Sequence, residues 1–320
     1  MENPKYVTVN GIKTRYFDEG AGEPLILFHG GSFGNTDNVD LADNWDRNWS
    51  WFLKSFHVYA PDKLGQGFTE LPQRDDEYTM AAVVQHAYDF IQKMGLKKVH
   101  LVGHSRGGFL VTRLALQYPE LVQTLVIVDS GTLAPGENPS NSKERSKMGR
   151  AKLLFDAPKP LLSLESLQWV SEAFSSSKEH VTGDWIAIRH QVANLPQSIQ
   201  AIEKMSTLFS ATFLPQLARQ KEETLQWIQA GRLKTPTLLV WGYNDPSALI
   251  SGGIELFGLL APSVSRAQMH IFNNAGHYSY REYPEDFARV VSDFIREGVG
   301  PQAEAGGSVG ANERSQSRGL

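Results

Sequence analysis

Cysteine is absent from the 320 residues of the chain. Its absence excludes disulfide bonds, thiolate nucleophiles and zinc-thiolate sites together, so any nucleophilic side chain must carry oxygen or nitrogen. Long apolar runs are also missing, because no stretch approaches the length needed to span a bilayer. Residues 1–10 lack the charged-then-apolar pattern of a secretion signal. We therefore expect a soluble, cytoplasmic protein that has no membrane partner.

A large excess of charge of either sign is lacking as well. The formal net charge is -4, and basic residues form no run longer than a few residues. Because nucleic-acid binding requires a basic patch or stripe, we expect no nucleic-acid partner. The composition, 41% hydrophobic and 21% charged, is that of an ordinary globular protein. A chain of this size can form one elaborated domain with a large core.

Short apolar runs alternate with helical patterns in the first part of the chain. Each run is as long as a strand that is buried on both faces. An alternation of such strands with amphipathic helices is typical of doubly wound sheets, so the sequence predicts an α/β fold with a mostly parallel sheet. The runs lie at residues 24–28, 56–60, 99–102 and 124–128.

The alternation breaks in the middle of the chain. Residues 133–232 contain successive amphipathic helical stretches without strands between them, and strand patterns then return. We expect a core formed by residues 1–132 and 233–298, with a helical cap inserted at 133–232. Residues 299–320 are rich in Gly, Ala, Ser and Gln. Since such a segment cannot bury enough surface to offset its ordering entropy, we expect a disordered tail.

The most informative motif is Gly-x-Ser-x-Gly at residues 103–107, between a strand pattern and a helix pattern. In a nucleophile elbow of this kind, the serine occupies a strained strand-to-helix turn, and the glycines let the flanking backbones approach closely. The same motif also arises by chance in ordinary glycine-rich turns. The strand before it and the helix after it favour Ser105 as a nucleophile.

Polar residues follow the ends of other predicted strands. Ligands bind at the carboxyl ends of strands in doubly wound sheets, so these residues are expected to meet Ser105. Asp245 and His277 follow two later strands, which gives the chain order nucleophile, acid, base. His277 would take the proton of Ser105, and Asp245 would hold the imidazole in the required tautomer. Asp129, at the end of another strand, is the alternative acid.

A glycine-rich loop follows the strand at 24–28. Its exposed amides make Gly31 the first expected oxyanion donor, and the amide of Arg106, directly after the nucleophile, is the second. His29 precedes the glycine pair and is interpreted as a histidine that shapes the loop. No cluster of metal ligands stands out in the sequence, and we expect neither a metal nor a cofactor.

The order of the three catalytic residues is that of the α/β-hydrolases, and residues 5–298 resemble this family throughout. Within it, the chain resembles the meta-cleavage product hydrolases, which hydrolyse a carbon–carbon bond of 2-hydroxy-6-oxo-hexa-2,4-dienoates in aromatic degradation. A serine at the elbow argues against haloalkane dehalogenases and epoxide hydrolases, which need an aspartate there. The resemblance rests on the segments 29–34, 44–48, 60–62, 65–67, 130–136 and 181–189.

The resemblance implies a mechanism and a substrate class. The dienol would be ketonised in the pocket, Ser105 would attack the C6 ketone, and water would hydrolyse the acyl-enzyme without a cofactor. The segments 103–107 and 130–136 are similar to the branch that acts on carbazole- or dibenzofuran-type products. A carboxylesterase or lactonase of the same fold is the alternative. A ligand receptor that reuses the pocket is a further one.

The resemblance also implies residues that bind the substrate. Arg189 would bind its carboxylate through a planar, permanently charged donor, with Asn44 as a polar partner. A solvent-exposed arginine and a helix N-cap before Trp45 are the structural alternatives for these two residues. His104 and Tyr278 are the other expected substrate-binding residues. They stand where asparagine and tryptophan are frequent in the family, which leaves open which ring substituent is accepted. The sequence leaves the oligomeric state open, and a homo-oligomer is compatible with it.

Overall fold

The computed structural model of the protein describes residues 1–136 and 150–298. Within these residues, eight strands form one sheet in the order β1-β2-β4-β3-β5-β6-β7-β8. β2 pairs antiparallel with both β1 and β4, and every other pair is parallel. The predicted mostly parallel α/β sheet is therefore confirmed. The strands are β1 (Lys5–Val9), β2 (Ile12–Gly20), β3 (Glu23–Phe28), β4 (Phe56–Pro61), β5 (Val99–His104), β6 (Val122–Val128), β7 (Thr237–Gly242) and β8 (Ala267–Phe272).

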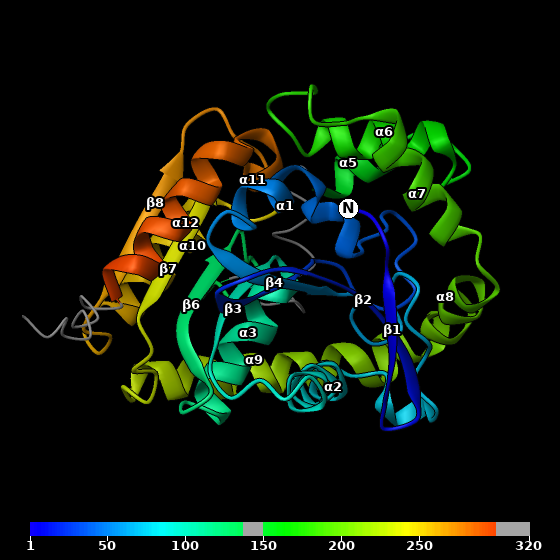
Figure 1. Ribbon diagram of the computed structural model, residues 1–320. Helices are drawn as coiled ribbons and strands as arrows, with labels where there is room; N and C mark the ends of the chain where they lie inside the picture. Colours follow the sequence, from blue (N-terminus) through cyan, green and yellow to red (C-terminus); the bar gives the residue numbers. More distant parts are fainter. Residues whose placement is uncertain (137–149, 299–320) are drawn as a thin grey trace, which may run out of the picture.

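Helices cover both faces of the sheet (Figure 1). α2, α3 and α9 lie along one face, and α1 and α12 lie along the other. α10 contributes to the same layer as α2 and α3. The helices of these layers and the short helical turns near them are η1 (Ala42–Trp45), α1 (Asp46–Phe52), η2 (Asp75–Glu77), α2 (Met80–Lys93), α3 (Arg106–Gln117), α9 (Leu214–Gln229), α10 (Ile250–Leu260), α11 (Ser279–Glu282) and α12 (Pro284–Gly298).

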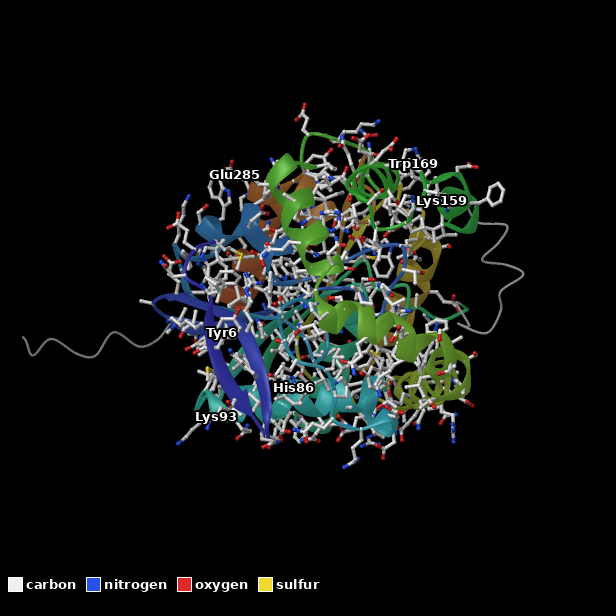
Figure 2. All side chains as sticks on the ribbon, turned by 90° about the vertical axis from the view of Figure 1, so that its right-hand side faces the viewer. Tyr6, His86, Lys93, Lys159, Trp169 and Glu285 are labelled. Carbon is white, nitrogen blue, oxygen red and sulfur yellow. The ribbon has the colours of Figure 1, made fainter. Side chains whose placement is uncertain are left out.

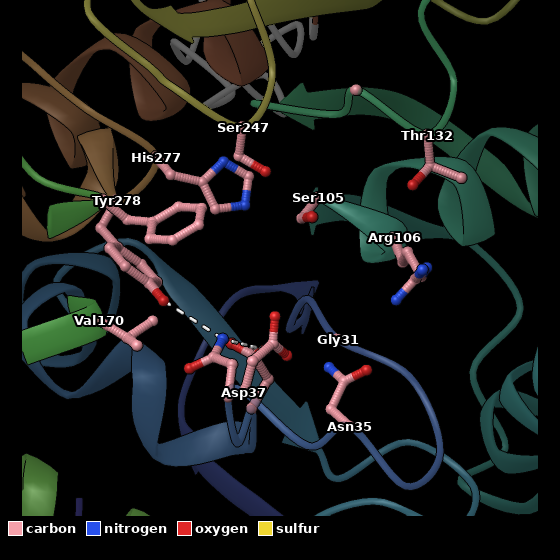
Figure 3. A pocket seen from close by; sticks show the side chains of 14 residues that line it. Gly31, Asn35, Asp37, Ser105, Arg106, Thr132, Val170, Ser247, His277 and Tyr278 are labelled. Atoms are coloured by element: carbon pink, nitrogen blue, oxygen red, sulfur yellow. Dashed lines mark hydrogen bonds between the residues drawn. The ribbon is translucent and has the colours of Figure 1, made fainter. Parts of the chain in front are cut away.

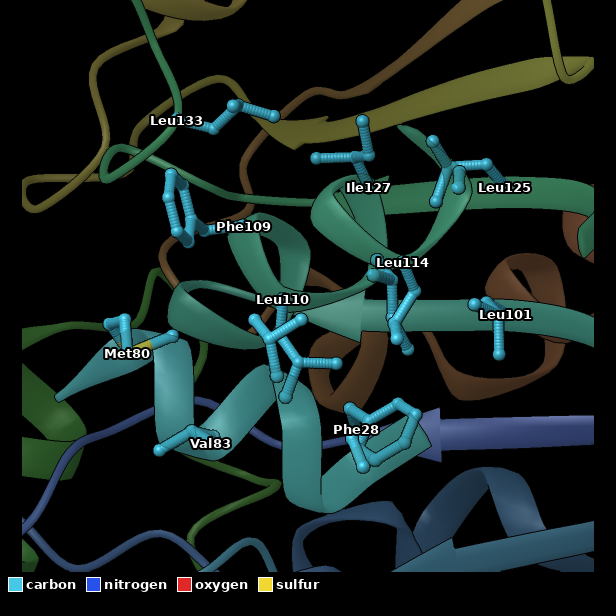
Figure 4. Packing of buried hydrophobic residues seen from close by; sticks show 14 of the residues in the cluster. Phe28, Met80, Val83, Leu101, Phe109, Leu110, Leu114, Leu125, Ile127 and Leu133 are labelled. Carbon is cyan, nitrogen blue, oxygen red and sulfur yellow. The ribbon is translucent and has the colours of Figure 1, made fainter. Parts of the chain in front are cut away.

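The core has two layers because successive strand residues face opposite sides of the sheet. In β3, Ile26 and Phe28 belong to the layer of α2 and α3, whereas Leu25 and Leu27 belong to the layer of α1 and α12. A strand that is buried on both faces must be apolar at every position, which explains the uninterrupted apolar runs of the sequence. Figure 4 shows Phe28 among the side chains of the first layer.

The segment between β6 and β7 forms helices in its described part. α6 and α7 pack together, and Trp169 of α6 lies at the opposite end of the molecule from His86 of α2 (Figure 2). α9 instead packs with α2 and α10, and its Leu217 and Ile228 join the layer under the sheet. The remaining helices of the segment are α5 (Arg150–Asp156), α6 (Leu164–Ala173), α7 (Gly183–Ala193), α8 (Pro196–Leu208) and the π-helical turn η3 (Phe209–Phe213).

The expected cap at 133–232 thus contains helices above the sheet and one helix, α9, that packs below it. The division of the chain into core and cap stays a prediction. Residues 137–149 of the expected cap and the expected tail at 299–320 lie outside the described residues. No helix in the described ranges is long and apolar enough to cross a membrane.

Replacement of Gly107 by alanine should destabilise the protein, because the new methyl group would overlap the carbonyl oxygen of Phe28 in β3. Overpacking of this kind costs about 1–3 kcal/mol of unfolding free energy, which urea denaturation measures. Gly183→Ala is the matched control, since nothing lies within 4 Å of its added methyl group. Equal losses in the two variants would contradict the close approach of α3 to β3.

Candidate active site

Ser105 lies in the turn between β5 and α3. Its backbone has φ 53° and ψ −119°, a conformation that residues other than glycine rarely adopt. Its amide donates to the carbonyl oxygen of Val128 at 2.8 Å, and its carbonyl accepts from Ser130 Oγ at 2.6 Å. The end of β6 therefore holds this strained residue on both sides.

His277 and Asp245 form a hydrogen-bonded pair near Ser105. His277 Nδ1 lies 2.7 Å from Asp245 Oδ2. Asp245 Oδ1 accepts from the amides of Ser247 and Ala248 at 2.6 and 2.9 Å, which fixes the carboxylate in the turn after β7. Because a carboxylate accepts hydrogen bonds, Nδ1 carries the proton and Nε2 can act as a base. Ser105 and His277 line the same cavity, and the imidazole ring points toward the serine (Figure 3).

Asp129, the alternative acid, has other partners. Its Oδ1 accepts from the amide of Gly242 at 2.7 Å, and its Oδ2 accepts from Ser279 Oγ at 2.6 Å. Burial, reinforced by the charge of Asp245, raises the pKa of Asp129 well above its usual range. The structure therefore places Asp245 at Nδ1 of His277, while Asp129 holds the backbone of β7 and the segment after His277.

The two expected oxyanion residues lie beside Ser105. Gly31 and Arg106 line the cavity together with the serine. Gly31 has φ +73°, and a side chain there would bring its Cβ within 2.7 Å of Asp40 Oδ2. Position 31 therefore requires glycine for both its backbone conformation and its contact with Asp40.

Two cavities meet at this place. The cavity at Ser105 measures about 40 Å³, and Asp37 and Asp40 are part of its lining. A second cavity of about 540 Å³ shares Asn35, Asp37 and Arg106 with it. The apolar residues of the larger cavity are Phe33, Leu154, Leu161, Ile202, Met205 and Phe209.

Asn44 lies within η1 and is fully buried. Its Nδ2 donates to Asp40 Oδ1 at 2.7 Å, and its Oδ1 accepts from Trp185 Nε1 at 2.9 Å. The N-cap of α1 is Trp45, so the interpretation of Asn44 as that cap is wrong. Asn44 lies behind Asp40, which itself faces the cavity.

Arg189, on α7, is also fully buried, so its interpretation as a solvent-exposed arginine is wrong. Its Nε donates to the carbonyl oxygen of Val39 at 2.7 Å, and its Nη1 donates to Ser171 Oγ at 2.5 Å. The guanidinium lies 4.2 Å from the ring centroid of Trp185. Among the described residues, Nη2 has no hydrogen-bond partner. Arg189 therefore keeps one donor for an added acceptor.

The rings of His104 and Tyr278 both lie near His277, with centroids 4.6 and 5.7 Å from that of its imidazole. Tyr278 lines the small cavity, and its hydroxyl accepts from Asn38 Nδ2 at 3.3 Å. His104 is buried, and its Nε2 donates to the carbonyl oxygen of His277 at 2.8 Å. His104 therefore supports the backbone of His277. In the ranges that the structure describes, no group of three or more acidic or histidine side chains is placed to hold a metal ion.

Replacement of His104 by asparagine should weaken the dependence of the free energy of unfolding on pH in the acidic range. Burial, together with the neighbouring His277, lowers the pKa of His104 from 6.5 to about 3. Between these values the unfolded state binds a proton that the folded state does not, so stability falls as the pH drops below 6.5. One such proton contributes up to about 1.4 kcal/mol per pH unit.

Urea denaturation of the wild type and of His104→Asn between pH 7 and 4 measures this slope. The same substitution at half-buried His190 is the matched control. An unchanged slope in His104→Asn would contradict the burial of a neutral imidazole behind His277.

Comparison with known proteins adds a family and its members. A family model described as the alpha/beta hydrolase fold matches residues 23–284. The 2-hydroxy-6-oxo-6-(2'-aminophenyl)hexa-2,4-dienoic acid hydrolase of Metapseudomonas resinovorans is 27% identical in an alignment 303 residues long, which covers 91% of this chain and 90% of that protein. The 2-hydroxymuconate semialdehyde hydrolase of Pseudomonas sp. strain CF600 is 29% identical in an alignment 299 residues long, which covers 90% of this chain and 92% of the relative.

A solved structure shares the architecture as well. It is a variant of the meta-cleavage product hydrolase CumD from Pseudomonas fluorescens IP01, complexed with acetates. The two chains are 25% identical and superpose with a TM-score of 0.69, over 92% of this chain and 97% of the other.

Proposed function

The chain belongs to the alpha/beta hydrolase fold family, and from this membership we propose that it is a serine hydrolase of ring-cleavage products. Its substrate would be a 2-hydroxy-6-oxo-hexa-2,4-dienoate formed in aromatic degradation, cleaved at a carbon–carbon bond. The observation that carries the serine mechanism is the 2.7 Å contact between Asp245 and His277 beside the strained Ser105. The substrate class is supported by what the similar hydrolases act on according to their names.

The proposed reaction begins with ketonisation of the dienol, in which the 2-hydroxyl group loses its proton and C5 gains one. Ser105 Oγ then attacks the C6 ketone. His277 Nε2 takes the serine proton, and the amides of Gly31 and Arg106 bind the oxyanion. The C5–C6 bond then breaks, its electron pair passes into the dienolate fragment, and His277 returns the proton to that fragment. Water finally attacks the acyl-enzyme and releases a carboxylic acid, while His277 again acts as base and then acid.

Binding of such a substrate would require rearrangement near residues 35–40. The cavity at Ser105, of about 40 Å³, is much smaller than the neighbouring one of about 540 Å³. The carbonyl oxygen of Val39 occupies a donor of Arg189, and the carboxylate of Asp40 occupies a donor of Asn44. In our proposal the carboxylate and enolate oxygens of the substrate take these places. The larger cavity of about 540 Å³ would then receive the apolar 6-substituent.

The alternative is a carboxylesterase or lactonase with the same catalytic residues. One observation favours it: two carboxylates, Asp37 and Asp40, line the cavity at Ser105. Such carboxylates repel an anionic dienoate but not an uncharged ester. The two candidates therefore differ in whether a substrate anion must be bound by Arg189.

The purified protein should bleach the yellow ring-cleavage product of a biaryl catechol, which absorbance follows directly. Arg189→Gln should raise the KM for this anion about tenfold or more, because a charge-assisted hydrogen bond contributes about 1.5–3 kcal/mol. The same variant should hydrolyse p-nitrophenyl acetate at the wild-type rate. Undiminished absorbance of the dienoate, together with rapid ester hydrolysis, would exclude the carbon–carbon hydrolase and support the esterase.

Asp245→Asn should lower kcat by about 10⁴-fold, because loss of the acid leaves the imidazole in the wrong tautomer. Asp129→Asn is the matched control, with the same substitution at the second buried carboxyl of the site. Its kcat should fall less than about tenfold, since Asp129 hydrogen bonds to Gly242 and Ser279. Steady-state rates with either substrate class measure both effects. A larger loss in Asp129→Asn would assign the role of the acid to Asp129.

A further inference from the structure

Two successive carbonyl groups of the glycine loop are held by side chains. The ring of His29 contacts the carbonyl oxygen of Gly30, with Nδ1 at 2.9 Å. Lys63 Nζ donates to the carbonyl oxygen of Gly31, also at 2.9 Å. The peptide planes before and after Gly31 are therefore both fixed, although the φ of this glycine alone would allow other conformations.

Lys63 also determines the tautomer of His29. The backbone amide of Lys63 donates to His29 Nε2 at 3.0 Å, so Nε2 is the unprotonated nitrogen. Nδ1 then carries the hydrogen and donates it to Gly30. In a planar trans peptide the carbonyl of Gly30 and the amide of Gly31 point in opposite directions. The hydrogen bond to Gly30 therefore aims the Gly31 amide away from His29.

Lys63 follows β4 and has only 2% of its surface exposed. Its charged surroundings come from two other elements: Asp40 after β3 attracts the ammonium, and Arg106 at the start of α3 repels it. Burial lowers the pKa of His29, after β3, and of His104, at the end of β5, so both histidines are neutral near pH 7. A buried ammonium destabilises a fold unless its contacts compensate. The contacts of Lys63 are those of the glycine loop.

We propose that Lys63 is a positioning residue for the reaction at Ser105. Its ammonium group holds the Gly31 carbonyl and so fixes the peptide plane after Gly31. Together with the hydrogen bond from His29 to Gly30, this keeps the Gly31 amide in the orientation that binds the oxyanion of the acylation step. This inference rests on the proposed role of Ser105 as nucleophile. It does not depend on whether the substrate is a dienoate or an ester, because both form an oxyanion.

The protonation of Lys63 gives the proposal a pH signature. Burial lowers the pKa of Lys63 to about 7. Above this value the charge-assisted hydrogen bond to Gly31 becomes a weaker neutral one, and the attraction to Asp40 is lost. Acylation should therefore slow as the pH rises through about 7. This slowing is the alkaline limb of the pH profile.

The test compares Lys63→Met with Lys221→Met, which removes a second buried lysine, on α9. The probe is p-nitrophenyl acetate, since its own charge does not change with pH. Lys63→Met should lower kcat at pH 6.5 by about 10- to 100-fold, below the loss for deleting an oxyanion donor, and leave KM within about twofold. The kcat of Lys63→Met should also not fall as the pH rises through about 7. Lys221→Met should keep both kcat and the limb.

Stability measurements separate positioning from folding. The unfolded state keeps a lysine proton up to about pH 10.4, whereas folded Lys63 loses it near 7. Between these values the wild type should gain stability relative to Lys63→Met as the pH rises. At pH 6.5 the variant should be at least as stable as the wild type, even though its kcat is lower. A loss of kcat that only parallels a loss of stability would overturn the proposal.

Two further outcomes would also overturn it. One is wild-type kcat and an intact alkaline limb in Lys63→Met. The other, decisive even if the variant does not fold, is a wild-type kcat that stays level from pH 7 to 9. Labelling of Ser105 by a fluorophosphonate distinguishes this failure from that of the proposed function. If Ser105 is not labelled, its proposed role as nucleophile is wrong. If wild type and Lys63→Met are labelled equally fast, only the proposed role of Lys63 is wrong.

Discussion

The strained backbone of Ser105 is the constraint on which the rest of the site depends. A residue with φ 53° stays in this conformation only where its surroundings fix it, and here the end of β6 provides hydrogen bonds to both its amide and its carbonyl. The turn also needs glycine at 103 and 107, where any side chain would overlap the backbone of α3 or β3. Packing of three parallel strands and one helix thus presents a single hydroxyl at the edge of the sheet.

The parallel sheet explains why residues far apart in sequence meet there. Gly31, Lys63, Asp245 and His277 each follow the carboxyl end of a different strand, so the strand order alone places them around Ser105. The same edge gathers several buried charges, and each carboxylate there is held by backbone amides or polar side chains. The neighbours of such a group decide its charge: burial and the nearby charge of Asp245 raise the pKa of Asp129.

The sequence predicted the parts of the molecule that local chemistry decides. Apolar runs marked the strands because both faces of the sheet are covered, and glycine spacing marked the turn at Ser105. Long-range packing decided the rest. The pattern of α9 is an ordinary amphipathic helix, and nothing in it indicates that it packs below the sheet with α2. From the sequence alone, Lys63 would be taken for a surface lysine, because its burial depends on packing against Asp40 and the glycine loop. The covering of Arg189 by Val39 has no local signal either.

The residues that line the larger cavity affect how this protein can evolve by mutation. Ile202 and Phe209, on α8 and the π-helical turn η3, face the cavity but make none of the hydrogen bonds that hold Ser105, Gly31 or His277. Phe209 is 37% exposed, so its replacement disturbs little of the core. Substitutions there can reshape the space next to Ser105 while the hydrogen bonds around Ser105, Gly31 and His277 stay in place. New substrate ranges are therefore within reach of single mutations at this wall.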